Sequence, residues 1–184
     1  MNARISELAS LPRTLLIDVP VSVIRTGVSV AITPFALLAL GKSTDLNEWA
    51  LVNSAHLGRI LPSLFEKTIK IINPKASLPS RQVRFVSSRT FHPIKQKAKS
   101  LAKSQSFFNR EVGSRVLHFI TAPVGVVASV ADLAIGILFA GAAILTLGTF
   151  ESLNHRAYTQ LDSLYILTIL AVSLLQTVNP KALF

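Results

Sequence analysis

The sequence repeats one series of landmarks, and this repeat constrains the fold more than any other feature. In the first copy the landmarks are Arg13, Pro20, Leu40-Gly41, Leu46-Asn47 and Asn73-Pro74-Lys75-Ala76. In the second copy they are Arg115, Pro123, Leu147-Gly148, Leu153-Asn154 and Asn179-Pro180-Lys181-Ala182. The order is the same, and the largest length difference, about four residues before Leu147, is close to one helical turn. Since internal repeats decide architecture, we expect two copies of one helical unit.

The composition favours a membrane protein. Apolar residues make up 50% of the chain and charged residues 15%, against roughly a quarter charged in a typical soluble domain. Little polar material is therefore left to cover a soluble globule. The chain has no cysteine, which excludes disulfides, thiolate metal sites and cysteine nucleophiles.

The second copy predicts a transmembrane helical hairpin. Pro123 suits the first turn of a helix and Gly148 suits its left-handed end. The helix between them is roughly 37 Å long, enough to cross a bilayer core with some tilt. A polar loop over residues 151–162 follows. The uncharged stretch from Ser163 to Asn179-Pro180, about 18 residues, is near the lower limit for a second span.

The first copy predicts a weaker membrane segment. Arg25 and Lys42 leave only 16 uncharged residues between them, Thr26 to Gly41, and Pro34 would kink a helix there, so we expect a partial span. Residues 57–72 then show the spacing of an amphipathic helix. This helix would lie at the lipid headgroups or pack its apolar face on the second hairpin, and the sequence does not separate these two placements.

The connector between the copies is strongly basic. From Ser77 to Arg115, nine lysines and arginines face one acid, Glu111, while the whole chain has a net charge of +10. The four lysines expected to contact lipid headgroups are Lys95, Lys97, Lys99 and Lys103. Anionic lipid contact and a solvated linker are the two main interpretations. Nucleic acid is disfavoured, because no binding motif accompanies the charge.

The charge distribution also predicts a topology. Lysine and arginine concentrate in loops kept on the cytoplasmic side, so we place the connector and both termini on the cytoplasmic face. The loops at 42–56 and 151–162 carry fewer basic residues and are the better candidates for translocation. The start of the chain does not resemble a secretory signal, since Glu7, Asp18 and Arg25 interrupt it.

Asp132 is the most informative single residue, because an ionisable group inside an apolar segment marks a functional or structural site. It lies on a row of small residues spaced four apart, where helices approach closely. The row comprises Ala128, Asp132, Gly136 and Ala140. We expect Asp132 to face another helix, to bind a backbone group or to pair with Arg25. An ion pathway and a shallow helix are the alternatives.

Catalytic and metal-binding patterns are not found in the sequence. The four histidines, His56, His92, His118 and His155, are widely spaced and form no ligand cluster. No nucleophile motif, paired carboxylate or cofactor motif stands out. We therefore expect no enzyme activity, no metal site and no cofactor.

The chain resembles hydrophobic membrane proteins of chlamydia-type intracellular bacteria, including the inclusion-membrane class with its bilobed hydrophobic region. The likeness rests on Val116 to Gly148 with Ser163 to Val178, and on the repeated Asn-Pro-Lys-Ala endings at Asn73 and Asn179. The resemblance implies insertion into a host-derived membrane and contact with host proteins through exposed segments.

These observations predict an all-α, membrane-embedded protein built as a tandem duplication of a helical hairpin. Repeat 1 covers residues 1–76, the basic linker covers 77–114, and repeat 2 covers 115–184. The expected function is a non-enzymatic membrane anchor, scaffold or interaction protein. A small transporter or channel subunit and a soluble helical lipid-binding protein are the alternatives. The expected partner is an anionic bilayer, and a protein partner bound through the loops or linker and a homo-oligomer both stay open.

Overall fold

The computed structural model describes residues 3–54, 57–78, 85–162 and 166–180, and these residues form helices and turns with no β-strand. The first part comprises α1 (Ala3–Arg13), a π-helical turn (Thr14–Asp18), α2 (Val19–Leu38), α3 (Thr44–Ser54), a 3₁₀ turn (Leu57–Arg59) and α4 (Ile60–Ile72). The rest comprises α5 (Phe85–Arg89), α6 (Phe91–Ala102), a second π-helical turn (Asn109–Gly113), α7 (Ser114–Leu145), α8 (Glu151–Leu161) and α9 (Ile166–Val178). The fold is therefore all-helical over the described ranges.

Two helical rods dominate the structure. One runs without a break from Arg4 to Leu38, and the other from Asn109 to Leu145. Both are long and apolar enough to cross a membrane by length and composition. At 37 residues the second rod is roughly 55 Å long, well beyond the ~30 Å of a bilayer core.

Pro123 lies inside α7, and the prediction that it begins a helix is wrong. Tertiary contacts hold the chain helical before the proline. The Ser114 hydroxyl donates to the Ala98 carbonyl at 3.2 Å, and the Thr121 hydroxyl lies 3.3 Å from that of Ser173. These contacts tie the turns before Pro123 to α6 and α9, so the helix tolerates the backbone hydrogen bond that proline lacks.

The two segments expected to be polar loops are helices. Residues 42–56 contain α3, and residues 151–162 contain α8. Their buried faces include the polar residues Asn47, Asn154 and Gln160. The sequence therefore lacks the regular spacing of apolar residues that identifies an amphipathic helix. Each unit predicted as a hairpin therefore contains a third helix.

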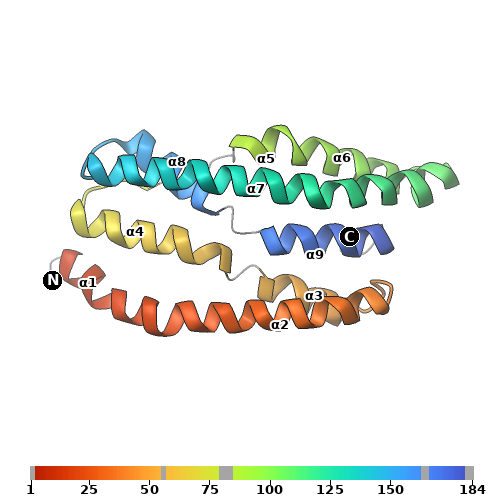
Figure 1. Cartoon of the computed structure of the whole chain (residues 1–184), viewed down its shortest axis with the longest axis horizontal. Coiled ribbons are helices and arrows are strands. Elements are labelled where there is room, and N and C mark those ends of the chain that lie inside the picture. Colours follow the sequence, from red (N-terminus) through yellow and green to blue (C-terminus); the bar gives the residue numbers. More distant parts are fainter. Residues whose placement is uncertain (1–2, 55–56, 79–84, 163–165, 181–184) are drawn as a thin grey trace.

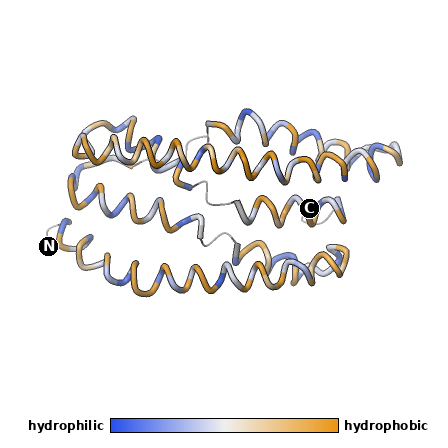
Figure 2. Tube along the Cα trace, in the orientation of Figure 1, coloured by the Kyte–Doolittle hydropathy of each residue, from blue (hydrophilic) through white to orange (hydrophobic). Residues whose placement is uncertain are grey.

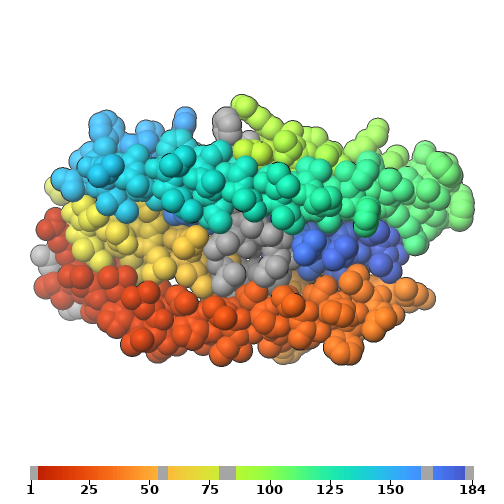
Figure 3. All heavy atoms as spheres, viewed as in Figure 1, coloured from red at the N-terminus to blue at the C-terminus, as the bar shows by residue number. Residues whose placement is uncertain are grey.

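The helices form an elongated slab. Figure 1 shows α2 and α7 running in opposite directions along the two long edges, with α4 and α9 between them. Helix α3 lies behind α2, and helix α8 lies behind α7. Helices α5 and α6 pack alongside α7. In the space-filling view, α2 and α7 border the front face, where α4 and α9 are also visible (Figure 3).

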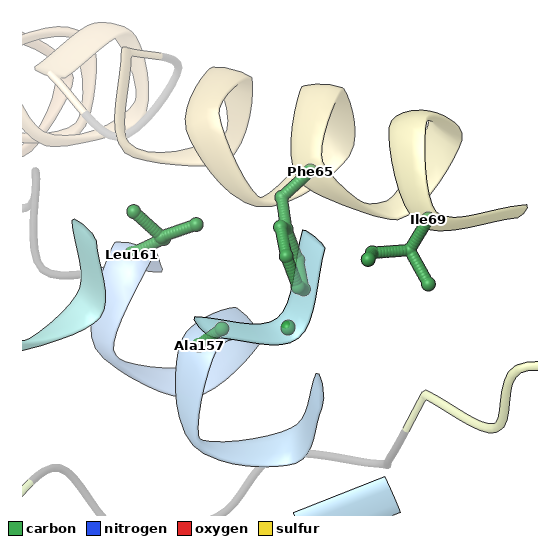
Figure 4. Packing of buried hydrophobic residues seen from close by; sticks show 5 residues of the cluster. Phe65, Ile69, Ala157 and Leu161 are labelled. Atoms are coloured by element: carbon green, nitrogen blue, oxygen red, sulfur yellow. The ribbon is translucent and has the colours of Figure 1, made fainter. Parts of the chain in front are cut away.

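The hydrophobic core joins the two halves of the chain. Phe65 and Ile69 of α4 pack against Ala143, Ala157 and Leu161 of α7 and α8 (Figure 4). Of the two placements left open for the amphipathic helix, the structure has the second: α4 packs its apolar face on the other half of the chain. This burial excludes the apolar face of α4 from water and supplies most of its stabilisation.

The long helices end in the same conformation. Leu40 and Gly41 have φ of 52° and 62°, and Leu147 and Gly148 have φ of 52° and 65°. The expected left-handed end at Gly148 is thus confirmed. Such a conformation favours glycine, which carries no Cβ. Asn47 donates its side-chain amide to the Gly41 carbonyl at 2.9 Å, and Asn154 donates to the Gly148 carbonyl at the same distance.

The two Asn-Pro segments cross between the halves. The Asn73 amide donates to the Gly148 carbonyl at 3.3 Å, and the Asn179 amide donates to the Gly41 carbonyl at 3.4 Å. Each turn therefore receives an asparagine from its own half and one from the other. As a consequence, α1 begins at one end of the slab and α9 ends at the other (Figure 1). A bilayer crossed along the long axis would place the start of α1 and the end of α9 on opposite sides, which differs from the predicted topology.

Candidate functional site: apolar outer faces and a buried polar seam

The outer surface of the first long rod is apolar over most of its length. Its exposed large apolar side chains are spread along the rod over a broad part of the helix circumference. They are Leu15, Leu16, Ile17, Val21, Val23, Ile24, Val30, Phe35 and Leu38. Exposed apolar side chains of this kind are unfavourable in water and favourable in lipid.

Helix α7 presents the same kind of surface. Its exposed large apolar residues are Val116, Phe119, Ile120, Val127, Val130, Ile137, Leu138, Ile144 and Leu145. Leu145 is 85% exposed and Leu138 is 75% exposed, so these side chains are not part of the core. The hydropathy colouring shows both long helices as predominantly apolar (Figure 2).

The buried faces of the same helices are small and polar. On α2 they carry Ser22, Thr26, Ser29 and Ala36. On α7 they carry Ser114, His118, Thr121, Ala122, Gly125, Ala128, Ser129, Asp132, Gly136 and Ala143. Helices packed in lipid show this pattern: large apolar residues face outward, and small or polar residues lie between the helices. A water-soluble helix has the opposite distribution.

The helices behind the long rods expose mainly polar side chains. Helix α3 exposes Asp45 and Glu48, α6 exposes Gln96 and Lys97, and α8 exposes Glu151, Ser152 and Arg156. Trp49 and Val52 are the large apolar exceptions on α3. The exposed apolar surface is therefore concentrated on α2 and α7, and the surfaces of α3, α6 and α8 are more polar.

Asp132 holds the connector against α7. Its two carboxylate oxygens accept hydrogen bonds from the backbone N–H of Val86 at 2.7 Å and of Ser87 at 2.9 Å. The Ser87 hydroxyl adds a third bond at 2.6 Å, and the carboxylate is fully buried. Backbone N–H groups at the start of α5 thus receive a charged acceptor from another helix. Of the roles expected for Asp132, binding a backbone group is the one these contacts describe.

Arg25 occupies a different environment from Asp132. It lies on α2 with an exposed side chain, whereas Asp132 is fully buried on α7. The two residues come from the opposite long edges of the slab (Figure 1). The contacts that position Asp132 come from Val86 and Ser87 of the connector.

The four connector lysines do not share one environment. Lys97 and Lys103 are exposed, whereas Lys95 and Lys99 are partly buried. The Lys95 ammonium lies 5.4 Å from the centre of the Phe91 ring, whose face attracts a cation. Burial lowers the pKa of Lys95, and the nearby charge of Lys99 lowers it further. The connector is thus partly a structural element, since α6 packs on α7 through buried Phe91, Ala98 and Ala102.

The predicted row of small residues lies at helix contacts. Ala128 is buried, and Ala140 is partly buried against the core cluster. At Gly136 a Cβ atom would lie 2.7 Å from the Leu161 backbone nitrogen and 2.8 Å from the Gln160 carbonyl carbon. Glycine at this position therefore allows α7 and α8 to approach at backbone distance.

Sequence reasoning missed a polar seam between α7 and its neighbours. His118 is fully buried, and neither ring nitrogen has a hydrogen-bond partner among the described residues. The Ser129 hydroxyl and the Gln176 carbonyl oxygen are likewise buried without a partner in that part of the chain. Ser114, His118 and Thr121 are spaced four and three residues apart, as on one face of a helix. This spacing could have predicted a polar face on α7.

The seam has no arrangement suited to metal binding: within the described ranges, no three His, Cys, Asp or Glu side chains gather to hold an ion. Comparison with known proteins adds no family. No family model matches the chain, and neither a curated protein nor a solved structure matches it.

Proposed function

We propose that this protein is a membrane-embedded, non-enzymatic anchor or scaffold that inserts the outer faces of α2 and α7 into lipid. The observation that carries the proposal is the reversed distribution of side chains on both helices. Their exposed positions are large and apolar, and their buried positions are small or polar. Lipid solvates the first set, while helix contacts and hydrogen bonds satisfy the second.

The surface area supports the proposal. A compact soluble protein of 19.9 kDa exposes roughly 8,700 Å², whereas this chain exposes 10252 Å². Large apolar side chains form much of the outer surface of both rods. Transferring one such side chain from water to hydrocarbon gains about 1.5 to 3 kcal/mol, so a stripe of nine favours lipid strongly.

A tandem duplication of a three-helix unit is part of the proposal. In it α2, α3 and α4 correspond to α7, α8 and α9. The support is local and repeated: the same left-handed Leu-Gly pair, the same Asn-to-Gly hydrogen bond and the same crossed contact from an Asn-Pro segment. Buried side chains also match, since Ala36 and Ala143, Ala50 and Ala157, and Ile69 and Leu175 are all fully buried.

The polar outer helices suit the interaction part of the role. If the resemblance to inclusion-type proteins reflects common function, α3, α6 and α8 are the helices that stay in water and contact a protein partner. The alternative of a transporter has less support, because the hydrogen bonds of Asp132 go to the connector. The alternative of a soluble bundle conflicts with the apolar outer faces.

Membrane extraction tests the proposal. We expect the protein to stay in the membrane pellet after carbonate treatment and to need detergent for extraction. Val127→Asp, at a position 70% exposed on α7, should release a substantial fraction of the protein. Val52→Asp, at a position 60% exposed on α3, is the matched control and should leave the protein in the pellet. A monodisperse wild-type protein in detergent-free buffer would contradict the proposal.

A further inference from the structure

The apolar stripe on α7 is too long for a simple crossing of a bilayer. From Val116 to Leu145 it extends roughly 44 Å, against about 30 Å of hydrocarbon. Between these two residues α7 carries a single charged residue, Asp132, and its side chain is buried. A helix standing upright would therefore leave about a third of its apolar face in water.

The stripe on the other rod contains an exposed charge near its middle. Arg25 lies roughly 15 Å along the helix from Leu15 and about 20 Å from Leu38. An upright α2 would place this arginine deep in hydrocarbon, where a charged side chain is strongly disfavoured. An α2 lying flat would place it among the headgroups, where arginine is favoured.

The two helices that carry the stripes lie on the same broad side of the slab. Helices α2 and α7 lie toward the viewer in Figure 1, and the polar helices α3 and α8 lie behind them. The crossed Asn73 and Asn179 contacts fix this arrangement at the two ends. The helices with apolar exposed side chains thus lie on one broad side, and the more polar helices α3 and α8 lie on the other. Interfacial helices show a comparable division between an apolar and a polar face.

We propose that the protein lies flat in one leaflet of an anionic bilayer, with α2 and α7 parallel to the membrane plane. This inference rests on the membrane role proposed above and assigns its geometry and lipid class. Exposed Arg25 and Arg115 adjoin the stripe residues Ile24 and Val116, and exposed Arg13 lies two positions before Leu15. In this placement the three arginines meet the phosphates at the edge of the inserted face. The net charge of +10 matches an anionic surface. In this placement both termini and the connector stay on one side.

Single-cysteine variants can measure the depth of each position, because the native chain has no cysteine. We would attach an environment-sensitive fluorophore at Leu16, Leu38, Val127 or Leu145, all strongly exposed, and reconstitute each protein in vesicles of phosphatidylcholine and phosphatidylserine. Gln96→Cys and Ser152→Cys on the polar helices are the controls. Lipids carrying quenchers at different acyl positions report depth, and an impermeant thiol reagent reports the side.

Four labels at one shallow depth, with both controls modified from the same side, would support the flat placement. A deep Val127 between shallow ends of the rods, or controls on opposite sides, would overturn it while leaving the membrane role intact. Labels that no lipid quencher reaches would overturn the membrane role itself. Replacing phosphatidylserine with phosphatidylcholine should lower binding at least tenfold, and unchanged binding would remove the anionic lipid from the proposal.

Discussion

Asn73 donates its side-chain amide to the backbone carbonyl of Gly148, 75 positions further along the chain, at 3.3 Å. The bond joins the end of α4 to the turn after α7. The Gly148 carbonyl also accepts from Asn154, and the Gly41 carbonyl accepts from Asn47 and Asn179. Each half of the chain therefore completes a turn in the other half, which makes the two halves interdependent.

Removing either local asparagine should destabilise the protein to a similar extent. Asn47→Ala and Asn154→Ala each remove one hydrogen-bond donor from a buried glycine carbonyl, at a cost of about 1 to 3 kcal/mol. Asn109→Ala is the control, because Asn109 is exposed. Unfolding of the detergent-solubilised protein gives the free energies. A large loss at one asparagine with no change at the other would argue against equivalent turns.

Asp132→Asn should loosen the connector. The substitution replaces one of the two carboxylate oxygens with an N–H₂ group, which then faces either the N–H of Val86 or the N–H and hydroxyl of Ser87, and we expect a loss of about 3 kcal/mol. Hydrogen exchange at the Val86 and Ser87 amides should rise more than exchange in α8. Asp45→Asn, at an exposed site, should cost less than about 1 kcal/mol. Unchanged exchange at Val86 and Ser87 would show that the carboxylate does not hold the connector.

The glycines of α7 provide a matched pair of substitutions. Gly136→Ala introduces a Cβ 2.7 Å from the Leu161 nitrogen, so α7 and α8 must separate and stability should fall by about 1 to 3 kcal/mol. At Gly141 nothing lies within 4 Å of the added Cβ, and Gly141→Ala should stabilise the helix by up to about 1 kcal/mol. Thermal unfolding measures both effects. Equal effects would contradict the close approach at Gly136.

Lys95 should make stability depend on pH in the alkaline range. Burial, with the charge of Lys99, lowers the pKa of Lys95 below 10.5 in the folded protein. Between the lowered pKa and that of the unfolded chain, the unfolded state binds more protons, so the free energy of unfolding rises with pH there. Lys95→Met should flatten this rise and increase stability at neutral pH.

The exposed Lys97 is the control for this measurement. Unfolding free energies collected from about pH 8 to pH 11 would separate the two positions, because an ordinary lysine titrates near the top of that range. Lys97→Met should keep the rise seen in the unmodified protein. A Lys95→Met protein with the same rise would assign the pH dependence to another group.

The sequence predicted the helical class and the left-handed end at Gly148, because both depend on local chemistry. Apolar periodicity identifies a long helix, and only glycine adopts positive φ without strain. The predictions for Pro123 and for the two polar segments were wrong because both depend on contacts between helices. The contacts of Ser114 and Thr121 with other helices override the local preference of proline. Buried Asn154 and Gln160 gave α8 the composition of a loop.

By itself the sequence determined that this chain is helical, that it is apolar on a scale unusual for a soluble protein, and that its landmarks recur in order. Only the tertiary structure decided which face of each long helix is exposed, since a helix that is apolar around most of its circumference has no single polar face to orient it. Tertiary structure alone also brought Asp132 to Val86 and Ser87, and Asn73 to Gly148. Those contacts join residues far apart in sequence, and no local preference encodes such a pairing.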